Sequence, residues 1–132
     1  MIVQKNHQRR RRTAFTLMEL MVVVALLVVL AGVGGYYFLK QLNTGQKKAA
    51  AAQVGVIANA AQMYATDHNG QLPQSLQQLT TRDDYGGPYL EPKGLVDPWQ
   101  KQYQYDPSGQ HNQGVKPDVW TTAQDGTVIG DW

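Results

Sequence analysis

TAFTLMELMVVVALLVVLAGVGGYYFL, residues 13–39, is the stretch that decides the fold, because it is apolar almost throughout and carries a single charge, that of Glu19. As an α-helix, residues 15–39 would be roughly 37 Å long at about 1.5 Å per residue. The hydrocarbon core of a bilayer is about 30 Å thick. The stretch therefore predicts a helix that crosses a membrane.

Glu19 is the unusual residue of this segment. A charged group at the centre of a membrane helix costs about 2.5–3.5 kcal/mol, and carboxylates inside such helices usually have a partner or a function. The alternative is that Glu19, close to the front of the apolar run, lies in the hydrated interface. We favour a partner, because the residues just before it carry a second signal.

That signal is a basic leader, residues 1–14, which holds Lys5 and the run Arg9 to Arg12 and no acidic residue. Without these five bases the net charge of +2 becomes −3, since seven basic residues then face ten acidic ones. An arginine run can bind nucleic acid or lipid headgroups. Directly before an apolar helix it more simply holds that end in the cytoplasm. We therefore expect a targeting leader that is not part of the fold, no nucleic-acid partner and an exported C-terminal part.

The remaining chain, residues 40–132, supports one small domain. Its first part continues the helix to about residue 66, because alanine-rich sequence favours helix and one face carries apolar residues at spacings of three, four and three. That face consists of Val54, Ile57, Ala61 and Tyr64. The whole chain contains no cysteine, which excludes disulfides and thiolate metal sites.

Residues 67–101 are expected to be a loop region with one short helix over residues 72–79, and residues 102–132 a small antiparallel sheet. β-Branched and aromatic residues between turn residues predict strands at 103–105, 118–122 and 127–129. The sheet needs the apolar helix face as its partner, so the fold class is α+β. We expect Trp99, Tyr103, Tyr105 and Trp120 to be core or strand residues, and Lys93, Asp97 and Asp118 to be solvated loop charges.

Candidates for catalysis are few. The serines are Ser75 and Ser108, and neither His68 nor His111 has a neighbour at a metal-ligand or nucleophile spacing. The acidic pair at residues 83–84 is best explained as a solvated turn. We therefore expect a protein that is not an enzyme.

A basic leader, then AFTLME at residues 14–19, then an apolar helix, is similar to the cleavage and methylation signal of type IV pilins and pseudopilins. GGPYL at 86–90, DPWQKQYQY at 97–105 and KPDVWTTAQDG at 116–126 resemble the major pseudopilin family of the type II secretion system, general secretion pathway protein G. This resemblance covers residues 9–132. It implies a type IV pilin-like fold, with the second half of a long helix packed on a small sheet.

The resemblance also implies three residue roles at the front of the helix. A prepilin peptidase would cut between Ala14 and Phe15, where the family usually has glycine before the cut, and Phe15 would then be N-methylated. Glu19 matches the carboxylate that faces the terminal amine of a neighbouring subunit. A buried ammonium and a buried carboxylate are each costly alone and tolerable as a pair.

Calcium is the one cofactor that the resemblance implies. The family's calcium loop usually continues after Asp-Gly with a glycine and an acidic pair, whereas this sequence continues TVIGDW. Asp125 matches the loop, and Asp131 could add a second ligand to an ion that takes six to eight oxygens. The alternative is that the Asp125-Gly126 dipeptide is only the turn of a hairpin.

We therefore expect a major pseudopilin of the bacterial inner membrane, with a single pass, a cytoplasmic N-terminus and a periplasmic domain. It would polymerise with itself into the periplasmic pseudopilus, together with minor pseudopilins and an inner-membrane assembly platform, and help to export folded proteins across the outer membrane. The alternatives are a minor pseudopilin or type IV surface pilin, and a membrane-anchored periplasmic binding module that keeps its leader and does not polymerise.

Overall fold

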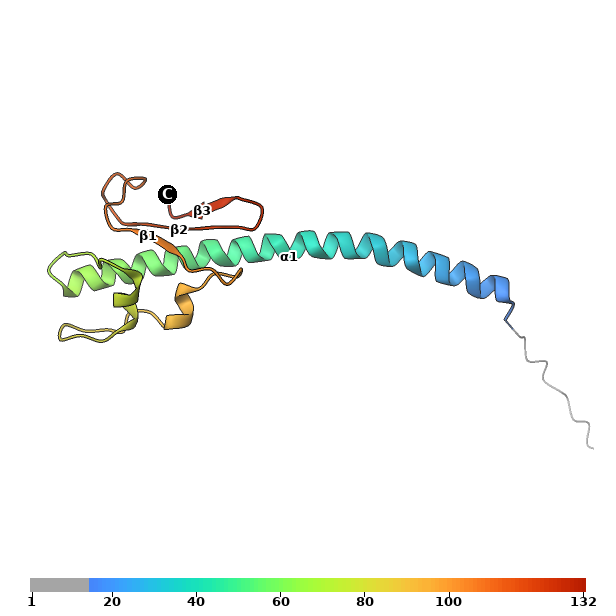
Figure 1. Ribbon diagram of the computed structural model, residues 1–132, viewed down its shortest axis with the longest axis horizontal. Coiled ribbons are helices and arrows are strands. Elements are labelled where there is room, and N and C mark those ends of the chain that lie inside the picture. The colour runs from blue at the N-terminus through green and yellow to red at the C-terminus, as the bar shows by residue number, and fades with distance from the viewer. Residues whose placement is uncertain (1–14) are drawn as a thin grey trace, which may run out of the picture. The chain divides into compact units, whose positions relative to one another are not determined.

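The computed structural model describes residues 15–132 as one long helix, two short 3-10 helices and three strands (Figure 1). A helix followed by a small sheet confirms the α+β, pilin-like class expected from the sequence. The leader, residues 1–14, lies outside the described residues. In chain order the elements are α1 (Leu17–Asp67), η1 (Leu76–Thr80), η2 (Pro92–Leu95), β1 (Gln104–Asp106), β2 (Asp118–Thr122) and β3 (Val128–Gly130).

The chain divides into two compact units, Met1–Leu39 and Lys40–Trp132. The described part of the first unit contains the apolar half of α1, where side chains such as Leu26 and Leu30 keep 59% and 67% of their surface exposed. Within residues 15–132, α1 is the one helix that is long and apolar enough to cross a membrane, and its most apolar window is not buried by the rest of the chain. A helix that is apolar on all sides requires lipid or other protein around it.

The second unit contains the sheet, with β2 between its two antiparallel neighbours. Tyr105 pairs with Val119 across β1 and β2, and Thr121 pairs with Ile129 across β2 and β3. In Figure 1 the strands lie along one side of the second half of α1, and η1 and η2 lie along the other. The helix is thus the common support of both layers.

The core of this unit forms on the predicted face of α1. Val54, Ile57 and Ala61 are buried, and Tyr64 packs against them half-buried. Apolar side chains from η1, from η2, from the segment before β1 and from β2 form one cluster with this face, so the hydrophobic effect joins the helix to the loops and to the sheet. These partners are Leu76 and Leu79 of η1, Leu95 of η2, Tyr103, and Val119 of β2.

The short elements differ slightly from the predicted ones. Residues 72–79 do not form a two-turn helix, because Ser75 is extended, with φ −148° and ψ 154°, and helical geometry starts only at Leu76. The carbonyl of Pro73 accepts a hydrogen bond from the Tyr105 hydroxyl at 2.8 Å. The 3-10 turn places Leu76 and Leu79 on one side, where both are buried. Tyr103 lies outside β1 because its N–H donates to Leu95, yet it is buried as expected. The first and third strands are each displaced by one residue, and the second agrees.

Asp97 and Asp118 are not solvated loop charges, as the sequence suggested, because they keep only 2% and 1% of their surface exposed. Oδ1 of Asp97 accepts hydrogen bonds from the N–H groups of Trp99 and Lys101 at 2.9 and 2.8 Å, and its Oδ2 accepts one from the hydroxyl of Thr121 in β2. A carboxylate can be buried when hydrogen bonds replace its water. Asp97 therefore joins the loop before β1 to the centre of the sheet.

Candidate functional site

The described chain begins at the residues to which the sequence assigned processing and assembly. Phe15 precedes the helix and is 84% exposed, and α1 begins two residues later. Ala14, the other half of the predicted cleavage site, lies outside the described residues. Cleavage and methylation therefore stay predictions, made about a terminus whose first described side chain is accessible.

Glu19 forms a capping box with Thr16. Its Oε2 accepts hydrogen bonds from the backbone N–H of Thr16 at 3.0 Å and from the Thr16 hydroxyl at 3.3 Å, while the N–H of Glu19 donates to that hydroxyl at 3.2 Å. This reciprocal pattern satisfies free N–H groups at a helix start. The carboxylate also lies at the positive end of the helix dipole, where negative charge is favourable.

The capping box went unnoticed in the sequence, although Thr-x-x-Glu at residues 16–19 is its ordinary signature. Its presence gives Glu19 a task within its own chain, besides the predicted contact with a neighbouring subunit. Cutting before Phe15 would place an ammonium group at the same helix start, where the dipole disfavours positive charge. Glu19 is the acidic residue in the first turn of α1 and would offset that charge.

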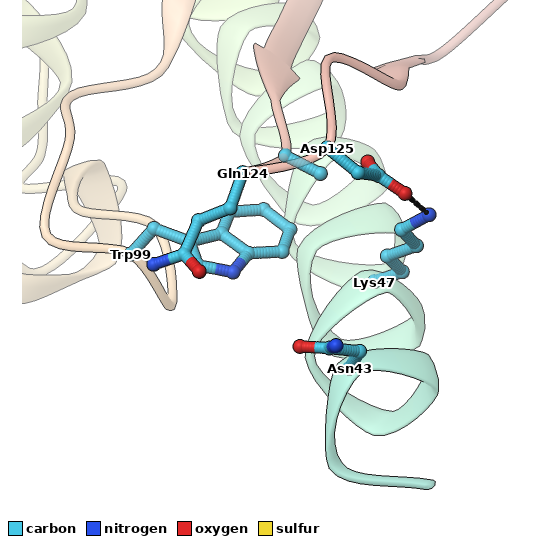
Figure 2. A pocket seen from close by; sticks show the side chains of 6 residues that line it. Asn43, Lys47, Trp99, Gln124 and Asp125 are labelled. Atoms are coloured by element: carbon cyan, nitrogen blue, oxygen red, sulfur yellow. Dashed lines mark hydrogen bonds and ion pairs between the residues drawn. The ribbon is translucent and has the colours of Figure 1, made fainter. Parts of the chain in front are cut away.

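Asp125 lies in the turn between β2 and β3 and is held by Lys47 of α1 (Figure 2). The Lys47 ammonium lies 2.5 Å from Oδ2 of Asp125 and also donates to the hydroxyl of Thr127 at 3.2 Å. The bond from Lys47, with further bonds from Thr127, lowers the pKa of Asp125 to about 2. A hairpin turn thus has its carboxylate paired to the helix rather than open to an ion.

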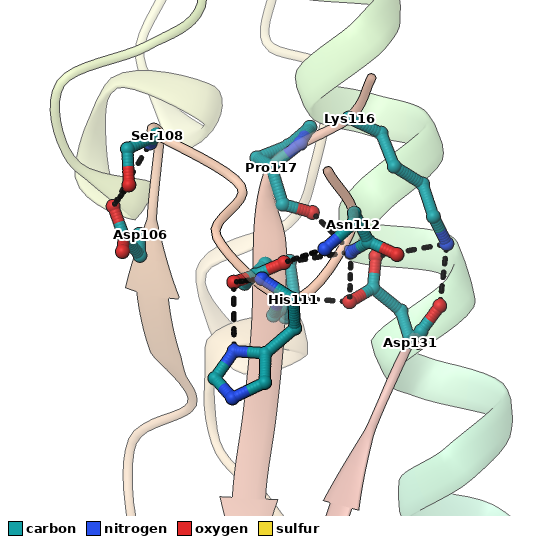
Figure 3. A network of polar contacts seen from close by, with 9 residues as sticks. Asp106, Ser108, His111, Asn112, Lys116, Pro117 and Asp131 are labelled. Atoms are coloured by element: carbon teal, nitrogen blue, oxygen red, sulfur yellow. Dashed lines mark hydrogen bonds and ion pairs between the residues drawn. The ribbon is translucent and has the colours of Figure 1, made fainter. Parts of the chain in front are cut away.

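Asp131 follows β3 at the other end of that strand and is nearly buried, with 4% of its side chain exposed. Its Oδ1 accepts hydrogen bonds from the N–H of Val119 and from the side-chain amide of Asn112, both at 3.1 Å (Figure 3). Asp125 and Asp131 are therefore at opposite ends of β3 and do not come together as one set of ligands. As a pair they do not fit calcium.

Clusters of three or more histidine and acidic side chains placed to hold a metal are absent from residues 15–132. Of the two serines considered for catalysis, Ser108 donates its hydroxyl to Oδ1 of Asp106 at 2.7 Å and Ser75 precedes η1, and neither bonds a histidine among residues 15–132. Calcium binding at either carboxylate stays a prediction.

His68, which the sequence left as a turn residue, connects the end of α1 to the following loop. Its Nδ1 is 2.8 Å from the carbonyl of Tyr64 and its Nε2 is 2.7 Å from Oδ2 of Asp83. Both partners are acceptors, so both ring nitrogens donate only if the imidazole is protonated. The ring stacks on Tyr64 with centroids 3.7 Å apart. Burial lowers the pKa of His68, but the bonds to Tyr64 and Asp83 outweigh it, and the net effect is a raised pKa.

We expect the melting temperature of the full chain to fall as the pH rises from about 6 to about 8. Protonated His68 stabilises the folded state, because its pKa is higher there than in the unfolded chain, where it is near 6.5. This contribution is complete below the unfolded pKa and is lost as the pH rises through the pKa of the folded state. Circular dichroism melting of wild type and His68→Gln measures the effect, which the substitution should reduce. Hydrogen bonds lower the pKa of Asp83 despite its burial, so the stability that the Asp83 carboxylate contributes is lost only at acidic pH. If the melting temperatures of the two proteins changed with pH by the same amount, His68 would not be the group responsible.

Two models of known protein families match this chain, one after the other along the sequence. The family model described as "Type II secretion system (T2SS), protein G" matches residues 37–131, and the model described as "Prokaryotic N-terminal methylation motif" matches residues 9–35. No curated protein and no solved structure matches the chain. The second match contains the capping box of Glu19, and the first contains the core and the sheet.

Proposed function

The chain belongs to the type II secretion system protein G family, and we propose that it acts there as the major pseudopilin, the subunit that polymerises into the periplasmic pseudopilus. Membership of this family makes the chain a pseudopilin of type II secretion, which is a structural subunit. The more specific role rests on one observation, the half-helix that is apolar on every side and that its own chain leaves uncovered.

Such a helix needs two successive environments in a subunit that assembles. A single N-terminal apolar helix fits a single-pass anchor in the inner membrane. In a filament the same surface would pack against copies of itself and exchange one dry environment for another. Head-to-tail contacts that do not close into a ring produce open helical filaments. The polar second unit would remain in water in both states.

Glu19 would select the position of each incoming subunit. A prepilin peptidase would remove residues 1–14, and the new amine of Phe15, once methylated, would approach Glu19 of the neighbouring subunit. Both charges are expensive in an apolar core unless they are paired. The carboxylate is exposed, and among residues 15–132 only Thr16 bonds it, so it is available to such a partner.

The remaining partners follow from this role. The arginine run would keep the N-terminus in the cytoplasm and Lys40–Trp132 in the periplasm. Minor pseudopilins and an inner-membrane assembly platform would act with the filament, whose extension would help folded proteins to cross the outer membrane.

Mass spectrometry of the intact protein from membranes tests the first step. We expect a chain that begins at Phe15, lacks residues 1–14 and carries one methyl group on its terminal nitrogen. Cross-linking with an amine-reactive reagent tests the second step, since Lys40 and Lys48 are exposed, and should produce a ladder of multiples of this chain.

The two measurements separate the alternatives. A retained leader, without cross-linked multiples of the chain, would contradict the assembly proposal and favour a membrane-anchored binding module. A processed chain that forms one cross-link to a different pseudopilin and no ladder of its own would indicate a minor pseudopilin.

A further inference from the structure

Two buried carboxylates lie at one end of the sheet, where β2 begins and β3 has ended. The side chains of Asp118 and Asp131 are 1% and 4% exposed. The side-chain amide of Asn112 bridges them, at 2.8 Å from Oδ1 of Asp118 and 3.1 Å from Oδ1 of Asp131 (Figure 3). Two like charges buried on a shared partner are unfavourable unless positive charge or hydrogen bonds compensate them.

Asp118 is compensated by hydrogen bonds from the loop before β2. Its Oδ2 accepts from the N–H of His111 at 2.8 Å and faces Nδ1 of His111 at 2.9 Å, and its Oδ1 accepts from the N–H of Asn112 at 3.1 Å. Burial raises the pKa of Asp118, but these bonds outweigh it and lower the pKa below its usual range. The His111 ring is stacked on Trp132 with centroids 4.1 Å apart, which holds the loop in place.

Asp131 is compensated by a charge. The ammonium of Lys116 donates to the backbone carbonyl of Asp131 and lies 3.2 Å from its Oδ2. That distance makes an ion pair, but the direction is poor for a hydrogen bond, and Oδ2 accepts none from any described residue. The positive charge of Lys116 is therefore what balances this buried oxygen.

A divalent ion would use the same positions. Asp131 could offer it Oδ2 and its backbone carbonyl, which are the two atoms that Lys116 contacts. The Oδ1 atoms of Asp118 and Asp131 already accept N–H groups, which a metal ion could not leave in place. Calcium requires six to eight oxygens and usually several carboxylates.

We propose that the Lys116 ammonium is the resident cation of this part of the fold, so that the end of the sheet closes without calcium. Lys116 lies within a loop that is 11 residues long, between the end of β1 and the start of β2. By joining this loop to Asp131, the ammonium also ties the loop to the segment after β3. The calcium prediction made from the sequence and this proposal give opposite expectations in the same experiment.

The experiment measures melting of the full chain in detergent micelles, with calcium chloride and with a chelator. We expect identical curves for the wild type. Lys116→Met keeps the length of the side chain and removes the charge, and should lower the melting temperature by about 5 °C or more. Lys93→Met is the matched control, because the Lys93 ammonium is in an exposed ion pair with Glu91, and it should melt as the wild type does.

Asp131→Asn, alone and combined with Lys116→Met, shows whether charge is responsible. Neutralising the carboxylate should recover part of the loss caused by Lys116→Met, so the two changes should be clearly non-additive. A lower melting temperature of the wild type in chelator would overturn the proposal, even if Lys116→Met did not fold. Equal melting of Lys116→Met and Lys93→Met, or strict additivity with Asp131→Asn, would overturn it as well.

Discussion

Glu19→Gln is expected to leave cleavage and methylation intact and to reduce incorporation into filaments more than tenfold. Glutamine preserves the capping box, in which either Glu or Gln can act, but it removes the charge that would pair with the amine of Phe15. An unpaired charge inside an apolar bundle costs several kcal/mol, and each 1.4 kcal/mol is a factor of about ten. Sheared filament yield and cross-linked ladders, normalised to the processed chain in membranes, measure the loss.

Thr16→Ala is the matched control. It removes the hydroxyl that bonds Glu19 but retains the carboxylate, so it should cost about 1 kcal/mol in capping and leave most assembly intact. The pair of variants separates charge from capping, which Glu19→Ala would remove together. If Thr16→Ala failed to assemble while Glu19→Gln assembled normally, the function of Glu19 would be to cap its own helix.

The parts of the fold that depend on local pattern were predicted well. The long helix with its apolar first half, and the buried face of Val54, Ile57 and Ala61, follow from composition and from helical spacing, which are properties of one continuous segment. The strands were located to within one residue because β-branched and aromatic runs are bounded by turn residues. Neither inference required knowledge of distant contacts.

The candidate site was only partly predictable, because its contacts depend on three-dimensional geometry and on residues that are far apart in the sequence. Glu19 was noticed because a carboxylate is rare in an apolar helix, but its bond to Thr16 is a matter of geometry at the helix start. The pairing of Asp125 with Lys47 joins residues 78 positions apart. No spacing rule in the sequence indicates such a contact, and a hairpin turn by itself suggests a free carboxylate.

Buried acids show the same limit. Asp97 was expected in solvent because it lies among proline and glycine residues, yet its Oδ2 is bonded by Thr121, 24 positions away. An aspartate that bonds only the N–H groups of its own turn can stay at the surface. An aspartate that also bonds a distant strand lies against that strand and is buried.

Two Asp-Pro turns of this chain make that difference measurable. In the first, Oδ1 of Asp97 accepts the N–H of Trp99 at 2.9 Å, and in the second, Oδ1 of Asp106 accepts the N–H of Ser108 at 2.8 Å. Asp97 is 2% exposed and bonds Thr121 in addition. Asp106 is half-buried, and its Oδ1 bonds only Ser108 among residues 15–132, through the N–H and the hydroxyl of that exposed residue.

Asp97→Ala should therefore lower the free energy of unfolding by about 3 kcal/mol, because it leaves the buried Thr121 hydroxyl and two backbone N–H groups without their acceptor. Asp106→Ala should cost about 1 kcal/mol or less, since water can replace the lost acceptor. Urea unfolding of the full chain in micelles, followed by tryptophan fluorescence, reports on both, because all three tryptophans lie in the second unit.

Asp97→Asn distinguishes hydrogen bonding from charge at this position. Its side-chain oxygen can still accept from Trp99 and Lys101, and its amide can donate to the Thr121 hydroxyl, so we expect it to retain most of the stability that Asp97→Ala loses. Equal losses for Asp97→Ala and Asp106→Ala would show that the connection to β2 contributes nothing. An Asp97→Asn variant as unstable as Asp97→Ala would instead show that the negative charge, rather than the hydrogen bonds, holds the loop to the sheet.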